Sequence, residues 1–124
     1  MRVHHVAVAV TNLEVSSSFY KEHFGFVEER ELTKPDWNRR GVLLKLGDMR
    51  LELFEFTKPV QRNASSHTTG LQHIGIEVSN VQEVYEQLQQ RGVDIDEPKK
   101  GSTCAWYCFL RDPDGIILEL YESK

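Results

Sequence analysis

The sequence predicts an α+β fold made of two βαβββ modules in tandem. HVAVAV at 5–10 is matched by HIGIEV at 73–78, and LELFE at 51–55 is matched by LELYE at 118–122. The two matches share nearly the same offset of about 67 residues, which indicates one supersecondary unit present twice. What is predicted for an element of the first half is therefore expected of its counterpart in the second.

Length and composition are those of one globular domain. The chain has 124 residues, of which 40% are hydrophobic and 27% charged. A module of about sixty residues buries too little surface to be stable alone, so the halves are expected to need each other or a second chain. We expect a single domain over 1–124, made of a module at 1–56, a linker at 57–69 and a module at 70–124.

Charge, hydropathy and cysteine positions argue against several classes of protein. The net charge of −4 argues against a general nucleic-acid surface. No apolar run reaches membrane-span length, and Met1 leads into a strand pattern with no signal peptide, so no membrane partner is expected. Cys104 and Cys108 stand four apart in a predicted strand, about 13 Å apart and beyond disulfide reach. Reduced thiols in a cytoplasmic protein are expected.

The first module opens with a strand over 2–10, in which apolar and small or polar residues alternate. Thr11-Asn12-Leu13-Glu14 predicts a capping box that starts a helix through about His23, which Gly25 ends. Three strands are then expected, at about 26–32, 41–46 and 49–56.

The second module repeats this order after the polar linker. Ser79-Asn80-Val81-Gln82 predicts another capping box, and Gly92 the end of the second helix. Asp112-Pro113-Asp114-Gly115 predicts a tight turn before the last strand. The three strands are expected at about 93–96, 104–110 and 116–122.

Strand alternation predicts which face each polar residue occupies. Bulky Val6, Val8 and Val10 fit against a helix, which leaves His5 on the opposite face; the same pattern places His73 opposite its own helix. Leucines on either side of Glu52 and of Glu119 likewise turn both carboxylates away from the helices. All four groups are therefore predicted on the faces that the helices do not cover.

Two imidazoles and two carboxylates suit Zn²⁺, Ni²⁺, Co²⁺ or Mn²⁺ at roughly 2.0–2.2 Å from each donor. Open water positions would complete an octahedral Lewis-acid site. The set contains the His/His/carboxylate triad of non-haem iron oxygenases, but the additional carboxylate argues against that chemistry. Taken singly, each residue is more often a surface or satisfied core group; the repeated quartet favours a metal.

Other histidines and glutamates have ordinary structural interpretations. His4 is expected to point to the helix side, His23 to lie favourably at a helix C-terminus, and His67 to lie in the linker. Glu55 and Glu122 repeat as well, but at strand ends they are expected to be solvated.

The segments HHVAVAV-TNLE, FYKEHFGF, LELFEF, GLQHIGIEV and DPDGIILELYE resemble the vicinal oxygen chelate (VOC) superfamily across essentially the whole chain. The resemblance is closest to its glyoxalase I-like (lactoylglutathione lyase-like) members and implies the VOC (glyoxalase/bleomycin-resistance/dioxygenase) fold. It implies that His5, Glu52, His73 and Glu119 are metal ligands, with Ni²⁺ or Zn²⁺ expected first and Co²⁺ or Mn²⁺ as alternatives.

The implied activity is that of a metal-dependent lyase or isomerase acting through an enediolate on a small 2-oxoaldehyde–thiol adduct. Removal of a proton beside a carbonyl becomes feasible when a metal stabilises the enediolate, and a carboxylate then serves as base. Glu119 is expected in that role, with Glu52 as its symmetry mate; the repeat makes the two nearly interchangeable.

The chain departs from glyoxalase I where glutathione is held. Ala7 and Ala9 stand where an arginine is common, and the asparagine expected shortly after Glu52 is missing. This argues against glutathione as the thiol. Candidates for binding an anionic substrate tail are Arg39 and Arg40 in a loop at 33–41, or Lys99 and Lys100 in the matching loop at 97–103. Taken singly, each is more often an ordinary solvated charge. Trp37 and Trp106 are near these loops and either wall the pocket or cover the sheet edges.

Two other functions stay open, because a fold does not fix a reaction. One is an acyl-CoA epimerase, which uses the same enolate chemistry. The other is a metal-free drug-binding protein of the bleomycin-resistance kind, which has no need of a His/Glu quartet. A homodimer that acts on a small molecule is expected, and the four ligands come from one chain or from two.

Overall fold

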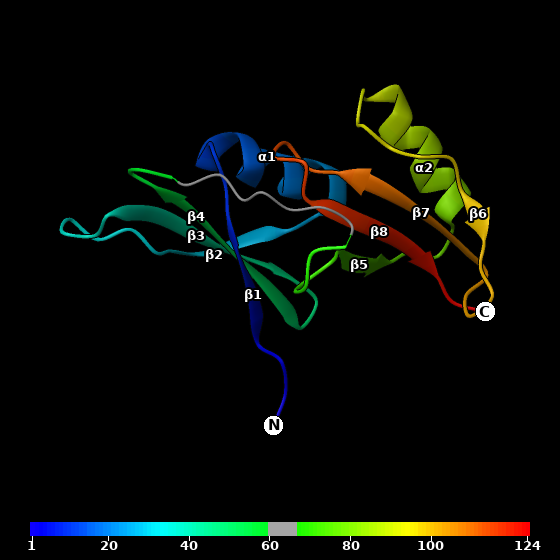
Figure 1. Ribbon diagram of the computed structural model, residues 1–124, viewed down its shortest axis with the longest axis horizontal. Helices are drawn as coiled ribbons and strands as arrows, with labels where there is room; N and C mark the ends of the chain where they lie inside the picture. Colours follow the sequence, from blue (N-terminus) through cyan, green and yellow to red (C-terminus); the bar gives the residue numbers. More distant parts are fainter. Residues whose placement is uncertain (60–66) are drawn as a thin grey trace. The chain divides into compact units, whose positions relative to one another are not determined.

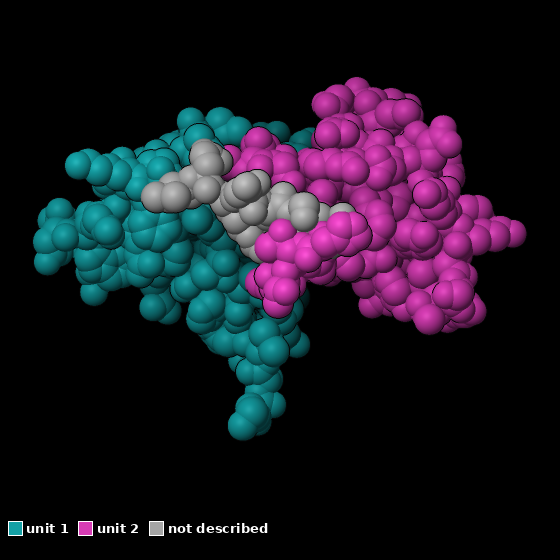
Figure 2. Space-filling model, in the orientation of Figure 1, with its two compact units in different colours: residues 1–62 teal, residues 63–124 magenta. Residues whose placement is uncertain are grey.

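The computed structural model describes residues 1–59 and 67–124 (Figure 1). The chain divides into two compact units, Met1–Arg62 and Asn63–Lys124, which Figure 2 colours separately. Each has one helix and a four-stranded mixed sheet, which confirms the α+β fold of tandem βαβββ modules. The predicted linker 57–69 lies partly outside the described residues, and the single-domain organisation stays a prediction.

The first unit contains one parallel and two antiparallel strand pairs. Its sheet has the order β1-β4-β3-β2, with β1 parallel to β4. The elements are β1 (His5–Ala9), α1 (Leu13–Phe24), β2 (Val27–Glu31), β3 (Arg39–Leu46) and β4 (Met49–Phe56).

The second unit repeats this topology. Its sheet has the order β5-β8-β7-β6, with β5 parallel to β8 and the other pairs antiparallel. The elements are β5 (Ile74–Glu77), α2 (Val81–Gln90), β6 (Lys99–Lys100), β7 (Trp106–Arg111) and β8 (Ile117–Glu122).

Each core lies between the helix and one face of its own sheet. In the first unit Tyr20 of α1 is buried, as are Leu44 of β3 and Leu53 of β4. In the second, Leu88 of α2 is buried together with leucines of β7 and β8, among them Leu118. Full burial of one such side chain is worth roughly 1.5–3 kcal/mol, so these buried positions fix which way β3, β4, β7 and β8 face.

The helices begin and end where local chemistry predicts, with a small correction at the start. The cap is asparagine in both units: Asn12 Oδ1 accepts from the Val15 N–H (3.1 Å), and Asn80 Oδ1 from the Glu83 N–H (2.9 Å). The predicted boxes began one residue too early. Gly25 follows α1 at φ 77°, a left-handed conformation that glycine adopts without steric cost.

Glu55 and Glu122 are structural, and the expectation that both are solvated was wrong. Glu55 accepts a hydrogen bond from the Leu13 N–H (3.0 Å), and Glu122 accepts one from the Val81 N–H (2.8 Å). Each carboxylate thereby satisfies a donor in the first turn of its helix, where negative charge is favoured. The repeat thus contains a helix–sheet connection as well as candidate ligands.

The strand predicted at 93–96 is not formed. Ile95 makes only an isolated bridge to Leu110, and Pro98, which has no N–H to donate, separates it from the short strand at Lys99–Lys100. Lys99 and Lys100 therefore lie in β6, and Arg39 and Arg40 begin β3. The expectation that these four cations lie in loops was wrong.

Both cysteines are free, as expected, and both are also buried. Burial, assisted by the charges of Asp96 and Glu119, raises the pKa of Cys108 to about 11, so its thiol stays protonated. No helix in the described part of the chain is long and apolar enough to span a membrane.

Gly41 of β3 allows a close approach by an aromatic ring from β4. The two strands place Gly41 opposite Phe54, and a Cβ built on Gly41 would lie 2.5 Å from two atoms of that ring. Phe54 is 7% exposed, although strand alternation puts it on the face away from α1. Because Gly41 has no side chain, the ring of Phe54 can lie against β3.

Replacing Glu55 with alanine is expected to destabilise the first unit by about 1–2 kcal/mol, because the Leu13 N–H and Arg40 lose their acceptor. The Leu13 N–H and then Arg40 lower the pKa of Glu55 below its ordinary 4.5 in the folded state. The stabilisation is therefore complete above that pH and is lost as the pH falls below it. Chemical denaturation from pH 3 to 7 measures both effects. Glu14→Ala, which removes an exposed partner of Arg40, is the control; equal losses in both variants would contradict this role.

Gly41→Ala is expected to lower the free energy of unfolding by about 1–3 kcal/mol, because the new methyl group overlaps the ring of Phe54. Gly75→Ala is the matched control: a Cβ there would meet only Glu119 Oε2, at 3.8 Å, an ordinary contact. Calorimetric melting of both variants tests this. Melting temperatures that shift equally would show that the Phe54 contact is not the cause.

Candidate functional site

The strand register places one histidine and one glutamate together in each unit. In the first, Ala7 of β1 lies opposite Glu52 of β4, and His5 precedes Ala7 by two residues on the same face. In the second, Gly75 of β5 lies opposite Glu119 of β8, and His73 precedes Gly75 by two residues. Residues that correspond in the sequence repeat therefore also occupy corresponding positions in the strand registers of the two units.

The side chains meet through the atoms that would bind a metal. His5 Nε2 lies 3.4 Å from Glu52 Oε1, and His73 Nε2 lies 2.9 Å from Glu119 Oε2. The two imidazoles are 41% and 38% exposed, and the two carboxylates 20% and 18%. The pairs are thus open to solvent on the imidazole side, while the carboxylates sit deeper on the sheet.

The donor sets fit a divalent cation. Two donors bound at about 2.1 Å to one ion, at right angles to each other, lie about 3 Å apart. The observed separations of 3.4 and 2.9 Å are close to this value. Imidazole with carboxylate is a donor combination that Zn²⁺, Ni²⁺ and Co²⁺ accept. Each pair therefore has the chemistry and spacing of half a four-ligand site.

Within residues 1–59 and 67–124, no three or more histidine, cysteine or acidic side chains gather closely enough to hold an ion. The His5–Glu52 pair belongs to the first unit and the His73–Glu119 pair to the second. The assembly of His5, Glu52, His73 and Glu119 into one metal site accordingly stays a prediction.

The surroundings of the two imidazoles differ. The His4 ring meets that of His5 edge-on, with 2.9 Å between their Nδ1 atoms. His4 is exposed, so the prediction that it points to the helix side was wrong. In the second unit the His73 ring instead contacts Phe109 of β7, with 5.4 Å between ring centroids. A hydrogen-bonding neighbour thus orients one imidazole and an apolar neighbour the other.

Among the candidate cations, Arg39 and Arg40 have opposite surroundings because they are adjacent in a strand. Arg40 lies on the helix face, where it binds Glu14 (2.6 Å) and Glu55. Arg39 lies on the open face, with its guanidinium carbon 4.0 Å from the centroid of Phe54 and 5.1 Å from that of Trp37. Lys99 and Lys100 are exposed in β6, and Lys100 lies over Trp106.

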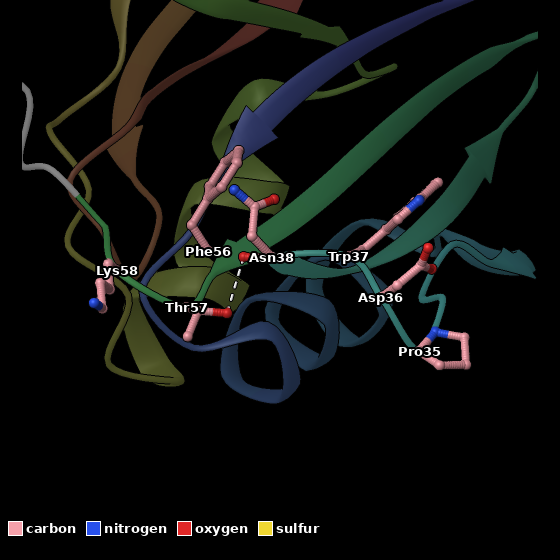
Figure 3. Close-up of a pocket in the computed structure, with 7 residues that line it drawn as sticks. All are labelled: Pro35, Asp36, Trp37, Asn38, Phe56, Thr57 and Lys58. Atoms are coloured by element: carbon pink, nitrogen blue, oxygen red, sulfur yellow. Dashed lines mark hydrogen bonds between the residues drawn. The ribbon is translucent and has the colours of Figure 1, made fainter.

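A pocket of about 420 Å³ lies where β3 begins and β4 ends (Figure 3). Trp37 and Phe56 supply its rings, and the Thr57 hydroxyl donates to the Asn38 carbonyl oxygen (2.9 Å), the dashed bond in the figure. Of the two tryptophans expected near a pocket, Trp37 lines this one. No pattern in the sequence pointed to Asn38 or Thr57.

Relatives of this chain include proteins with assigned activities and proteins without. The Escherichia coli K12 protein YaeR is 31% identical over 98% of this chain and 96% of its own. Mouse mitochondrial methylmalonyl-CoA epimerase is 30% identical over 98% of this chain and 73% of its own. Lactoylglutathione lyase of Escherichia coli O157:H7 is 29% identical over all of this chain and 94% of its own.

Solved structures agree with the fold. The crystal structure of SMU.1112c has a TM-score of 0.88 and 30% identity, over 98% of each chain. That of a glyoxalase family protein from Enterococcus faecalis has a TM-score of 0.86 and 32% identity, over 98% of this chain and 97% of the other. The model of the Glyoxalase/Bleomycin resistance protein/Dioxygenase superfamily matches residues 2–120, and the chain therefore belongs to that superfamily.

Proposed function

We propose that this protein is a metal-dependent, glyoxalase I-like lyase or isomerase. It moves a proton at a carbon next to a carbonyl in a small 2-oxoaldehyde–thiol adduct. The observation that supports this most is the repeated contact of an imidazole Nε2 with a carboxylate oxygen, formed at the same register in both units. A packing role does not require two such pairs on faces that the helices leave uncovered.

In this proposal His5, Glu52, His73 and Glu119 hold a divalent ion, Ni²⁺ or Zn²⁺ first and Co²⁺ or Mn²⁺ as alternatives. Such an ion acts as a Lewis acid that stabilises negative charge on the oxygens beside the acidic carbon. The small residues next to the ligands, Ala7 in the first unit and Gly75 in the second, leave space in which a substrate can approach.

Glu119 is proposed as the base that takes the proton from carbon and returns it to the adjacent carbon. Its carboxylate is the more closely paired of the two, and Gly75 opposite has no side chain to shield it. Glu52 is its counterpart in the first unit and the alternative base. A positioned carboxylate within reach of the acidic carbon can take a proton and return it, as general base catalysis requires.

An acyl-CoA epimerase is the second candidate. It is supported by the 30% identity to methylmalonyl-CoA epimerase over nearly the whole chain. In an epimerase one carboxylate would take the proton and another would deliver it to the opposite face of the same carbon, and the repeat supplies two such groups. The two reactions differ in which carbon receives the proton.

The assembly and the compartment are proposed from the resemblance. A homodimer in the cytoplasm, acting on a small molecule, is the state expected of such duplicated modules. The two buried free thiols accord with a reducing compartment.

Purified wild-type protein, reloaded with Ni²⁺ or Zn²⁺, is expected to bind about one ion per chain. His5→Ala and His73→Ala should each weaken binding at least tenfold, because each removes a ligand. His67→Ala, an exposed histidine outside the strands, should bind as the wild type does. Calorimetric titration with elemental analysis measures this. A wild type that takes up no stoichiometric metal would contradict the proposal and favour a drug-binding protein.

Glu119→Gln is expected to slow solvent-hydrogen exchange at the acidic carbon of a methylglyoxal–thiol adduct by about 10²–10⁴-fold, since the base is lost. Glu86→Gln, on the exposed side of α2, should exchange at the wild-type rate. Proton NMR in D₂O follows the reaction and shows which carbon receives deuterium. If Glu52→Gln loses hydrogen exchange while Glu119→Gln keeps it, Glu52 is the base and Glu119 is its counterpart. If both variants exchange normally, neither glutamate is the base.

A further inference from the structure

Arg39 is held in place by aromatic rings on the face that carries Glu52. In the β3–β4 register Arg39 lies opposite Phe56, Gly41 opposite Phe54 and Leu43 opposite Glu52. Arg39 is half-buried, and its guanidinium carbon lies 4.0 Å from the ring centroid of Phe54 and 5.9 Å from that of Phe56. Such stacking fixes a planar cation while leaving the N–H groups at its edge free to donate.

Three other arginines in the described chain, each on a strand, have carboxylate partners. Arg40 binds Glu14 and Glu55, Arg50 binds Glu29 (2.7 Å), and Arg111 binds Asp96 (2.7 Å). Within residues 1–59 and 67–124, Arg39 has no such ion pair. An oriented guanidinium with free donors is the group that recognises a carboxylate or a phosphate in two-point fashion.

The distance from Arg39 to Glu52, a proposed metal ligand and the alternative base, limits the length of a ligand that reaches both. Phe54, under the guanidinium, is two residues from Glu52 on the same face of β4, about 7 Å along the strand. Trp37 and Phe56 contact the guanidinium and also line the pocket of about 420 Å³. The Lys34 ammonium, 5.0 Å from the Trp37 centroid, adds positive charge. An anion bound by Arg39 would thus lie on the order of 10 Å from a carbon at Glu52.

We propose that Arg39 binds the oxyanion tail of the substrate and so determines which thiol the enzyme accepts. This rests on the proposed function, because the reacting carbon is placed at the four proposed metal ligands, of which Glu52 is one. The short separation favours the carboxylate of a small thiol. The phosphates of coenzyme A lie farther from its thiol, at the end of a long arm. They offer the same oxyanion chemistry and are tested as the second possible ligand of Arg39.

The test measures binding without turnover. S-methylglutathione and coenzyme A are titrated into the full-length wild type, Arg39→Gln, Arg39→Lys and Arg30→Gln, all loaded with Ni²⁺. Arg30 is an exposed arginine of β2, so its replacement changes net charge equally without touching the aromatic cluster. Arg39→Gln should weaken binding of the carboxylate probe about 10- to 100-fold. Arg39→Lys should be intermediate, and Arg30→Gln should stay within about twofold of the wild type.

Stronger binding of coenzyme A with the same dependence on Arg39 would support the subsite with phosphate as its ligand. Equal binding by wild type and Arg39→Gln, or no binding of either probe, would overturn the inference. Metal uptake and hydrogen exchange on the same preparations separate it from the proposed function. If Arg39→Gln keeps metal uptake, hydrogen exchange and the wild-type KM for an anionic adduct, only the subsite fails. If the wild type shows neither metal uptake nor hydrogen exchange, yet binds a probe through Arg39, the enzymatic function fails and the subsite stands.

Discussion

The parallel pairing of the first and last strand of each module is the constraint on which the candidate site depends. It fixes the residue opposite each glutamate, Ala7 for Glu52 and Gly75 for Glu119, and thereby brings the histidine two positions earlier to the carboxylate. A shift by one residue would turn both side chains toward the helix, because strand side chains alternate between faces. The buried leucines that flank each glutamate resist such a shift.

The same two strands also hold the helices. Glu52 and Glu55 are three apart, an odd number, so they project from opposite faces of β4. One meets His5 on the open face, and the other accepts the Leu13 N–H at the start of α1. Glu119 and Glu122 divide these two tasks in the same way on β8. The orientation of the open face is therefore coupled to helix docking, because one strand register serves both faces.

Much of the fold could be predicted from the sequence because its signals are local. Period-two alternation placed His5 and Glu52 on one face, a capping box placed the start of α1 to within one residue, and Gly25 marked its end. The roles of Glu55 and Glu122 could not be predicted, since they depend on which helix end lies across the strand. Arg39 and Arg40 were indistinguishable while both were assigned to a loop; once β3 begins at Arg39, alternation separates them. Aromatic stacking over Gly41 has no sequence signal, because it joins residues from two strands.

The central proposal is that the His5–Glu52 pair of the first module and the His73–Glu119 pair of the second bind a single ion together. X-ray absorption at the metal edge of the Ni²⁺- or Zn²⁺-loaded protein tests it most directly. The account predicts two imidazole nitrogens and further oxygen donors at about 2.0–2.2 Å, with one imidazole lost in His5→Ala and one in His73→Ala. A single imidazole in the wild type, a sulfur neighbour, or a spectrum unchanged by either substitution would contradict it.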